Sequence, residues 1–113
     1  MIGKVALAVL LSVSVAQAVT LEWDAPAVGV PQGYTLYRQV VPGGVCGTAI
    51  LPNFEVKGST LVGVREFTDS SPVIGANYYH VTAYNAGGES LPSNQVCFQL
   101  VPKVTSPQNL RIR

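Results

Sequence analysis

One histidine and two cysteines are the residues of this chain best suited to chemistry. His80 could act as a general base only with a partner within hydrogen-bond reach. No nucleophile motif, paired carboxylates or phosphate-binding glycine loop accompanies it. Together with His80, Cys46 and Cys97 supply fewer ligands than the four that a structural zinc site needs. The sequence therefore predicts no enzyme: no catalytic residue, no metal site and no cofactor.

The N-terminus has the features of a signal peptide. Lys4 precedes an apolar run, and small residues at Ala16 and Ala18 fit the positions that a signal peptidase reads. Residues 1–18 are therefore predicted to be removed by cleavage after Ala18. The apolar run is shorter than the ~20 residues that span a bilayer, so a retained anchor is the less favoured alternative. The mature chain is expected to be secreted, periplasmic or at a cell surface, with no stable membrane anchor.

Export changes the interpretation of Cys46 and Cys97. In an oxidising compartment the two cysteines are predicted to form a disulfide, and the alternative is a pair of free thiols, at least one of them buried. Because the loop between them is long, the chain-entropy model gives such a bridge roughly 4 kcal/mol of stabilisation.

The rest of the composition favours short strands. Charged residues make up 12% of the chain, and 11 glycines and 8 prolines interrupt it at short intervals. The cations are scattered singly, which argues against a nucleic-acid partner. Alternating apolar residues predict strands at 19–25, 33–41, 61–69, 77–85 and 94–101, with at best a short edge strand within 49–57. Such a chain is expected to be all-β, with two packed antiparallel sheets.

The order of these segments resembles the fibronectin type III family. The stretches "VTLEWDAP", "GYTLYR" and "VTAYNAGGES" match, in order, its second strand, its third strand and the region joining its sixth and seventh strands. The resemblance implies an immunoglobulin-like β-sandwich over residues 19–101. The predicted core is Trp23, Tyr34, Leu36, Tyr79, Val81 and Ala83.

Three features depart from that family. Asn77 stands where a tyrosine is usual, so the family's tyrosine corner is either missing or built from Tyr78. The family domain usually carries no disulfide. The segment resembling a first strand, Pro107–Ile112, lies in the C-terminal tail, residues 102–113, instead of ahead of Val19. Three alternatives stay open for this tail: donation to a second molecule, parallel docking on its own sheet, or disorder. In a single chain it should project from the sheets or dock loosely.

The functional prediction is a secreted interaction or adhesion module. Loops or a sheet face would contact a protein or glycan at a cell or virion surface, as in small exported proteins of bacteria and phages. Tyr78, His80 and Tyr84, on the predicted outer face of one strand, form a possible binding face, with ordinary cross-strand packing as the alternative. The second functional class is a structural subunit that assembles head-to-tail through Pro107–Ile112.

Overall fold

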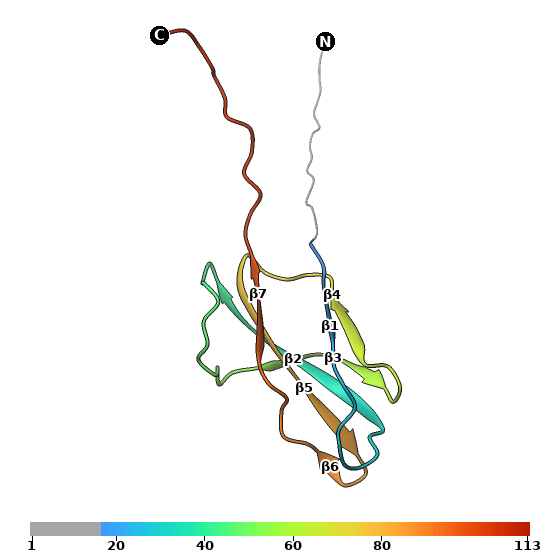
Figure 1. Ribbon diagram of the computed structural model, residues 1–113. Coiled ribbons are helices and arrows are strands. Elements are labelled where there is room, and N and C mark those ends of the chain that lie inside the picture. Colours follow the sequence, from blue (N-terminus) through green and yellow to red (C-terminus); the bar gives the residue numbers. More distant parts are fainter. Residues whose placement is uncertain (1–16) are drawn as a thin grey trace, which may run out of the picture.

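The computed structural model describes residues 17–113, which form two antiparallel sheets (Figure 1). In the smaller sheet, β1 (Val19–Glu22) pairs with β4 (Glu66–Asp69). The larger sheet has the order β3 (Glu55–Leu61), β2 (Gly33–Pro42), β5 (Gly75–Asn85), and the far edge of β5 pairs with β6 (Gly88–Glu89) and β7 (Val96–Leu100). No helix occurs in the described residues. The predicted all-β class with two antiparallel sheets is confirmed.

The core lies between the two sheets. Tyr34 and Leu36 of β2 and Tyr79 of β5 are buried, at 3%, 2% and 0% exposure. Trp23, which follows β1, meets Tyr34 edge to face with ring centroids 5.5 Å apart, a favoured aromatic geometry. From β4, the Phe67 ring packs directly over Gly58 of β3, where a larger residue would collide with it. These contacts join the layers into a sandwich-like arrangement.

The predicted core is only partly closed. Trp23, Val81 and Ala83 are half-buried instead of buried. Trp23 and Val81 border a groove beside β1, and Ala83 borders a pocket between loops. The expectation that all six residues are fully buried is therefore wrong for these three. The sheets leave the groove beside β1 and the pocket between the loops uncovered.

Two strands differ in extent from the prediction. The edge strand expected within 49–57 begins at Glu55 and continues to Leu61. The strand expected from 61 to 69 is reduced to β4, because Gly63 adopts a φ of +90° and the Val64 amide donates to Leu61 across a turn. A turn was expected at Ala86–Ser90, and the short strand β6 lies within it.

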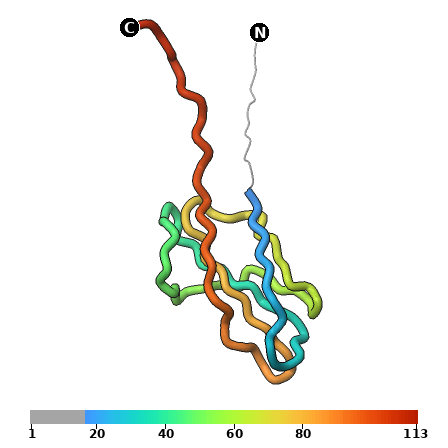
Figure 2. Tube along the Cα trace, in the orientation of Figure 1, coloured from blue at the N-terminus to red at the C-terminus, as the bar shows by residue number. Residues whose placement is uncertain are grey.

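Residues 101–113 leave the sheets at the end of β7 and contain no strand (Figure 2). They are exposed throughout, and Leu110 and Ile112 have exposed fractions of 101% and 96%. The prediction of a projecting tail is confirmed. Residues 1–16, which make up most of the predicted signal peptide, lie outside the described part of the chain.

Candidate functional site

Tyr78, His80 and Tyr84 share one face of β5, opposite the core residue Tyr79. Tyr78 is only 5% exposed, and its hydroxyl accepts a hydrogen bond of 2.7 Å from the Gly47 amide. The loop between β2 and β3, residues 43–54, lies over it. The expectation of a solvent-facing aromatic triad is therefore wrong for Tyr78, since the chain covers this part of the face with its own loop.

A disulfide between Cys46 and Cys97 holds loop 43–54 on that face, with the two Cα atoms 5.9 Å apart. Gln99 of β7 reinforces it, because its side chain accepts from the Cys46 amide at 2.6 Å and donates to the Gly44 carbonyl at 2.8 Å. Gln95 makes a similar pair of bonds to the backbone of residues 49 and 51. The predicted disulfide is confirmed, and the loop reaches β7 by crossing the face of β5.

His80 lies between two aromatic rings. Its ring centroid is 4.1 Å from that of Phe54 and 5.1 Å from that of Tyr37. Burial lowers the pKa of His80, and the charge of Glu89 only partly opposes that effect. Tyr84 is half-buried, and its hydroxyl lies against Gly33 of β2. The aromatic face is therefore a packed surface, in which His80 stacks between its neighbours.

Glu89 contacts this aromatic cluster through Tyr37. Its Oε2 accepts hydrogen bonds from the hydroxyls of Thr82, at 2.6 Å, and Tyr37. The Thr82 bond, followed by the Tyr37 bond, lowers the pKa of Glu89, and Glu89 in turn raises the pKa of Tyr37. Both hydrogen bonds favour the ionised form of Glu89, and both are donated to the same oxygen, Oε2. The cluster links β6 to β5 and β2 through these two hydrogen bonds.

A buried carboxylate that sequence reasoning missed lies between the sheets. Asp69, at the end of β4, is 0% exposed; its Oδ2 accepts from Tyr79 Oη at 2.5 Å and Arg38 Nη1 at 2.9 Å. Lys57 Nζ lies 3.5 Å from Oδ1, and the Ser71 amide donates to Oδ1 at 2.9 Å. The signal in the sequence was Arg38, whose strand alternation placed it on the core side, where a charge needs a partner.

The pKa values in this network follow from its geometry. Burial by itself would raise the pKa of Asp69, but the Tyr79 hydroxyl, the Ser71 amide and the cations of Arg38 and Lys57 outweigh it and lower the pKa. Burial first, and then the Asp69 carboxylate, raise the pKa of Tyr79. The network is a satisfied structural ion pair that links β4 to β2 and β5.

Asn77 stands at the position where the resemblance led us to expect a tyrosine. Its side chain is fully buried, accepts from the Val73 amide at 2.8 Å and donates to the Val73 carbonyl at 2.8 Å. It therefore fixes the loop between β4 and β5 from inside the fold. Of the two alternatives that the sequence left open, a tyrosine corner built from Tyr78 is wrong, because Tyr78 bonds to Gly47. The other alternative, a missing tyrosine corner, agrees with the structure, in which Asn77 makes the contact to this loop.

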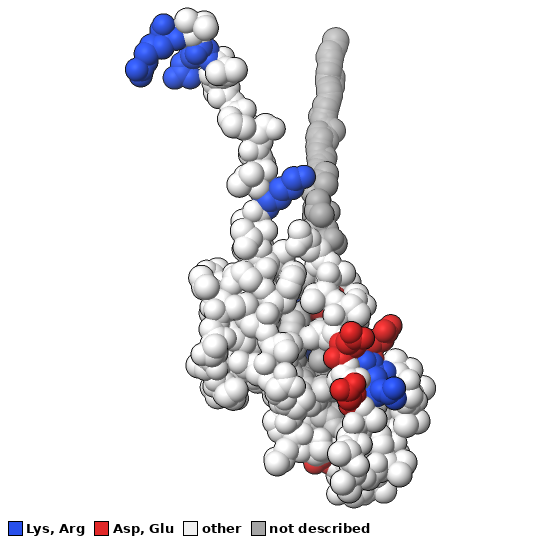
Figure 3. Space-filling model, viewed as in Figure 1, with Lys and Arg blue, Asp and Glu red and all other residues white. Residues whose placement is uncertain are grey.

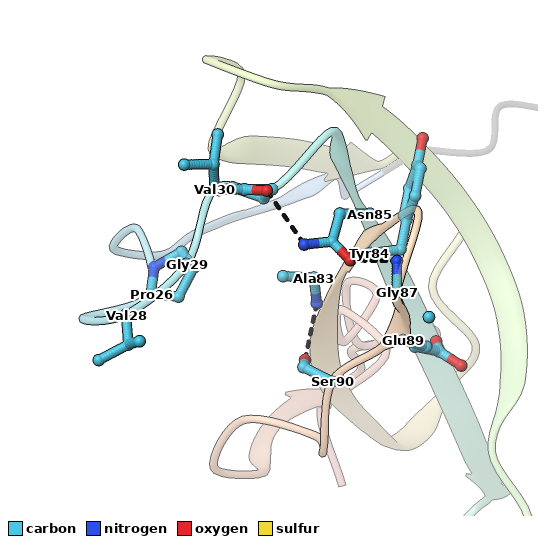
Figure 4. Close-up of a pocket in the computed structure, with 12 residues that line it drawn as sticks. Pro26, Val28, Gly29, Val30, Ala83, Tyr84, Asn85, Gly87, Glu89 and Ser90 are labelled. Atoms are coloured by element: carbon cyan, nitrogen blue, oxygen red, sulfur yellow. Dashed lines mark hydrogen bonds between the residues drawn. The ribbon is translucent and has the colours of Figure 1, made fainter.

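A pocket of about 250 Å³ opens at one end of the molecule (Figure 4). It lies between residues 26–31, which join β1 to β2, and residues 83–90 of β5, the turn and β6; we call this the loop end. Asn85 Nδ2 donates to the Val30 carbonyl at 3.3 Å and so ties the two sides together. Val28 and Val30 project beside the pocket with exposed fractions of 89% and 79%.

A second depression, of about 380 Å³, runs along β1. We call it the edge groove. Leu21 and Trp23 form one wall, Leu36, Tyr79 and Val81 form its floor, and residues 93–96 form the other wall. The Trp23 Nε1 atom is buried and has no acceptor within residues 17–113. The sequence alone did not indicate this groove.

Within residues 17–113 no group of three or more His, Cys, Asp or Glu side chains is placed to hold a metal ion. None of these residues belongs to a helix with the length and apolar character needed to cross a membrane. Comparison of the chain with protein-family models, curated proteins and solved structures finds no match. Functional inference therefore rests on the loop end and the edge groove.

Proposed function

We propose that this chain is an exported, non-enzymatic binding module of the fibronectin type III-like, immunoglobulin-like sandwich type, which contacts a protein partner through its loop end. The observation that carries the proposal is the exposure of Val28 and Val30 beside a concave pocket. Apolar side chains this exposed, clustered at the rim of a hollow, are characteristic of interaction surfaces.

The chemistry of the loop end favours a protein over the other partner classes. Prolines, valines and glycines make up most of the pocket lining, together with Ala83, Tyr84, Asn85 and Ser90. Its one carboxylate, Glu89, already accepts two hydroxyl hydrogen bonds. A volume of about 250 Å³ suits a single apolar side chain from a partner. The pocket offers no cation to a phosphate backbone. Tyr84 is the one aromatic residue that lines the pocket, and loop 43–54 covers the aromatic face at Tyr78, which leaves little stacking surface for a glycan.

Export is supported by two independent features. The sequence of residues 1–18 has the composition of a signal peptide. The Cys46–Cys97 disulfide belongs to an oxidising environment, such as the periplasm or the outside of a cell.

The test compares two matched double variants of the full-length chain, purified after export. Val28→Asp with Val30→Asp adds two charges at the loop end. Val45→Asp with Ile50→Asp adds two charges at residues that are also exposed, 82% and 77%, but lie on loop 43–54. Surface proteins from the source culture are captured on each immobilised chain, identified by mass spectrometry and titrated individually.

We expect a partner that binds the wild-type chain and the loop 43–54 variant alike. Its affinity for the loop-end variant should be at least about tenfold weaker, because an apolar contact becomes a buried charge. If the partner bound both variants with equal affinity, the loop end would be excluded as its binding surface. If the chain bound glycans on a glycan array but captured no protein, the proposal of a protein partner would be wrong.

A further inference from the structure

β1 has one free edge in the described fold. β1 pairs only with β4, so its second edge faces no described strand. The Trp23 amide donates to Arg65 on the β4 side, so the backbone groups of alternate residues, Thr20 and Glu22, point toward the free edge. An exposed row of such groups is a template for another strand.

The edge groove lies on the core side of this edge. Its half-buried apolar side chains, Leu21, Trp23 and Val81, together with the exposed Val96, have no covering element among residues 17–113. A strand added beside β1 would cover them with every second side chain, because side chains alternate between the two faces of a sheet.

The opposite face of β1 is acidic. Glu22 lies directly across from Glu66 in the β1–β4 register, and Asp24 follows nearby. No ion pair to these three carboxylates is formed within residues 17–113. Figure 3 shows acidic side chains gathered on this part of the sheets around a cationic group, and Arg65 lines the same surface as the three carboxylates. Like charges directly opposite each other destabilise a sheet, so a cation on an added strand would relieve them.

The tail has the complementary pattern. Leu110 and Ile112 alternate with Arg111 and Arg113, and the tail carries no acidic side chain. Both apolar side chains are fully exposed. Figure 3 shows cations and no acidic groups along the projecting segment. The tail therefore offers apolar residues for a groove and arginines for an acidic face, on alternate sides of one strand.

The tail cannot easily reach its own groove in the antiparallel sense. Leu100 pairs with Gly75 and Val19 pairs with Asp69, and only residues 70–74 separate Asp69 from Gly75. The tail therefore starts at the end of the molecule where β1 begins, whereas an antiparallel neighbour of β1 must enter near Trp23. In the structure it continues away from the sheets (Figure 1).

We propose that the tail of one copy, residues 107–113, docks as an antiparallel strand on β1 of the next copy and fills its edge groove. Ile112 then lies opposite Leu21, Leu110 opposite Trp23, and Arg111 opposite Glu22. Arg111 and Glu22 exchange backbone hydrogen bonds, and their side chains pair beside Glu66. Asn109, at a φ of +59° in the free tail, becomes extended on docking. Each contact joins two different surfaces, so repetition yields a head-to-tail chain or a ring.

The tail is a suitable place for test substitutions, because Leu110 and Ile112 are fully exposed in the single chain. The full-length protein is studied by sedimentation velocity over a concentration series. Leu110→Asp and Ile112→Asp should each weaken assembly by about ten- to a hundredfold, from the loss of one buried aliphatic side chain. Val104→Asp is the matched control: this residue is 87% exposed and lies outside the docking segment, so assembly should be unchanged.

A charge reversal tests the register. Arg111→Glu should weaken assembly, and combining it with Glu22→Arg should restore at least part of the loss. Hydrogen exchange should show protection of the Glu22 and Arg111 amides only in the assembled protein. A monomer at every concentration, with or without a protected tail, would overturn the proposal, as would tail variants that assemble like the wild type. The loop-end variant Val28→Asp with Val30→Asp should still assemble, which separates this inference from the proposed function.

Discussion

Replacing Asp69 with Asn tests the network between the sheets. The substitution keeps the size and one oxygen of the side chain but removes its charge. The new amide group then faces donors, because Arg38, Tyr79 and the Ser71 amide all donate to Asp69. Arg38 and Lys57 lose their counter-charge. The variant should fold less stably, with β4 loosened from the larger sheet.

The size of the loss follows from the exposure of the groups left behind. Removing one partner of a fully buried ion pair costs about 3–5 kcal/mol. The side chains of Arg38 and Lys57 are 19% and 24% exposed, so water can partly solvate them after the substitution. This places the expected loss near the lower end, at about 3 kcal/mol. In a domain of this size that lowers the melting temperature by roughly 12–24 °C.

The pH dependence provides a second, independent measurement. Because the pKa of Asp69 is lowered on folding, its stabilisation is fully present above the unfolded value of about 3.9 and is lost as the pH falls through the folded pKa. The stability difference between wild type and Asp69→Asn should therefore be constant near neutral pH and shrink below about pH 4.

Urea unfolding, followed by tyrosine and tryptophan fluorescence at several pH values, measures both quantities. Asp24→Asn is the control, since this exposed carboxylate should change the free energy of unfolding by less than about 0.5 kcal/mol. A loss below about 1 kcal/mol at neutral pH, or a difference that persists unchanged into acid, would refute the assignment of Asp69 as the ionised centre of this network.

Two further predictions concern the loop over β5 and its anchor. Joint replacement of Cys46 and Cys97 by Ser should lower the free energy of unfolding by about 4 kcal/mol, as should reduction of the wild type; denaturant titration with a loss under about 1 kcal/mol would contradict this role. Gly75 has a φ of +118°, and a side chain there would meet the backbone of Val41 and Gly43. Gly75→Ala should therefore cost about 3–5 kcal/mol from strain and overlap. Gly29→Ala, at a φ of +90° with nothing within 4 Å, should cost only about 1–2 kcal/mol; equal losses would argue against the close approach.

The strand alternation was sufficient to predict the core of the larger sheet. Tyr34, Leu36 and Tyr79 are apolar or aromatic at every second position, and the structure buries them together. The start of β3 was harder to place, because Pro52 suggested an interrupted strand and gave no position at which the pairing begins. The turn at Gly63 was also missed, since Leu61, Val62 and Val64 are apolar but remain exposed.

The candidate sites were less accessible from the sequence because they depend on contacts between distant segments. A strand pattern places Tyr78 and His80 on the outer face, but cannot show that loop 43–54 folds back over them. Asp69 has no neighbour in the sequence that identifies it as buried; Arg38 and Lys57 reach it from two other strands. Asn77 acts through local hydrogen bonds to Val73, yet its burial depends on β7, whose Phe98 carbonyl also accepts from it.

The Cys46–Cys97 bridge also decides how the molecule responds to a mechanical load. Tension between β1 and the tail would pass directly from Cys46 to Cys97, so that residues 47–96 lie off the load-bearing path. Their contour length, about 170 Å if fully extended, stays locked while the bridge is intact. Under force, only the segments that precede Cys46 and follow Cys97 can extend. Reduction of a single covalent bond would thus convert a short tether into a long one.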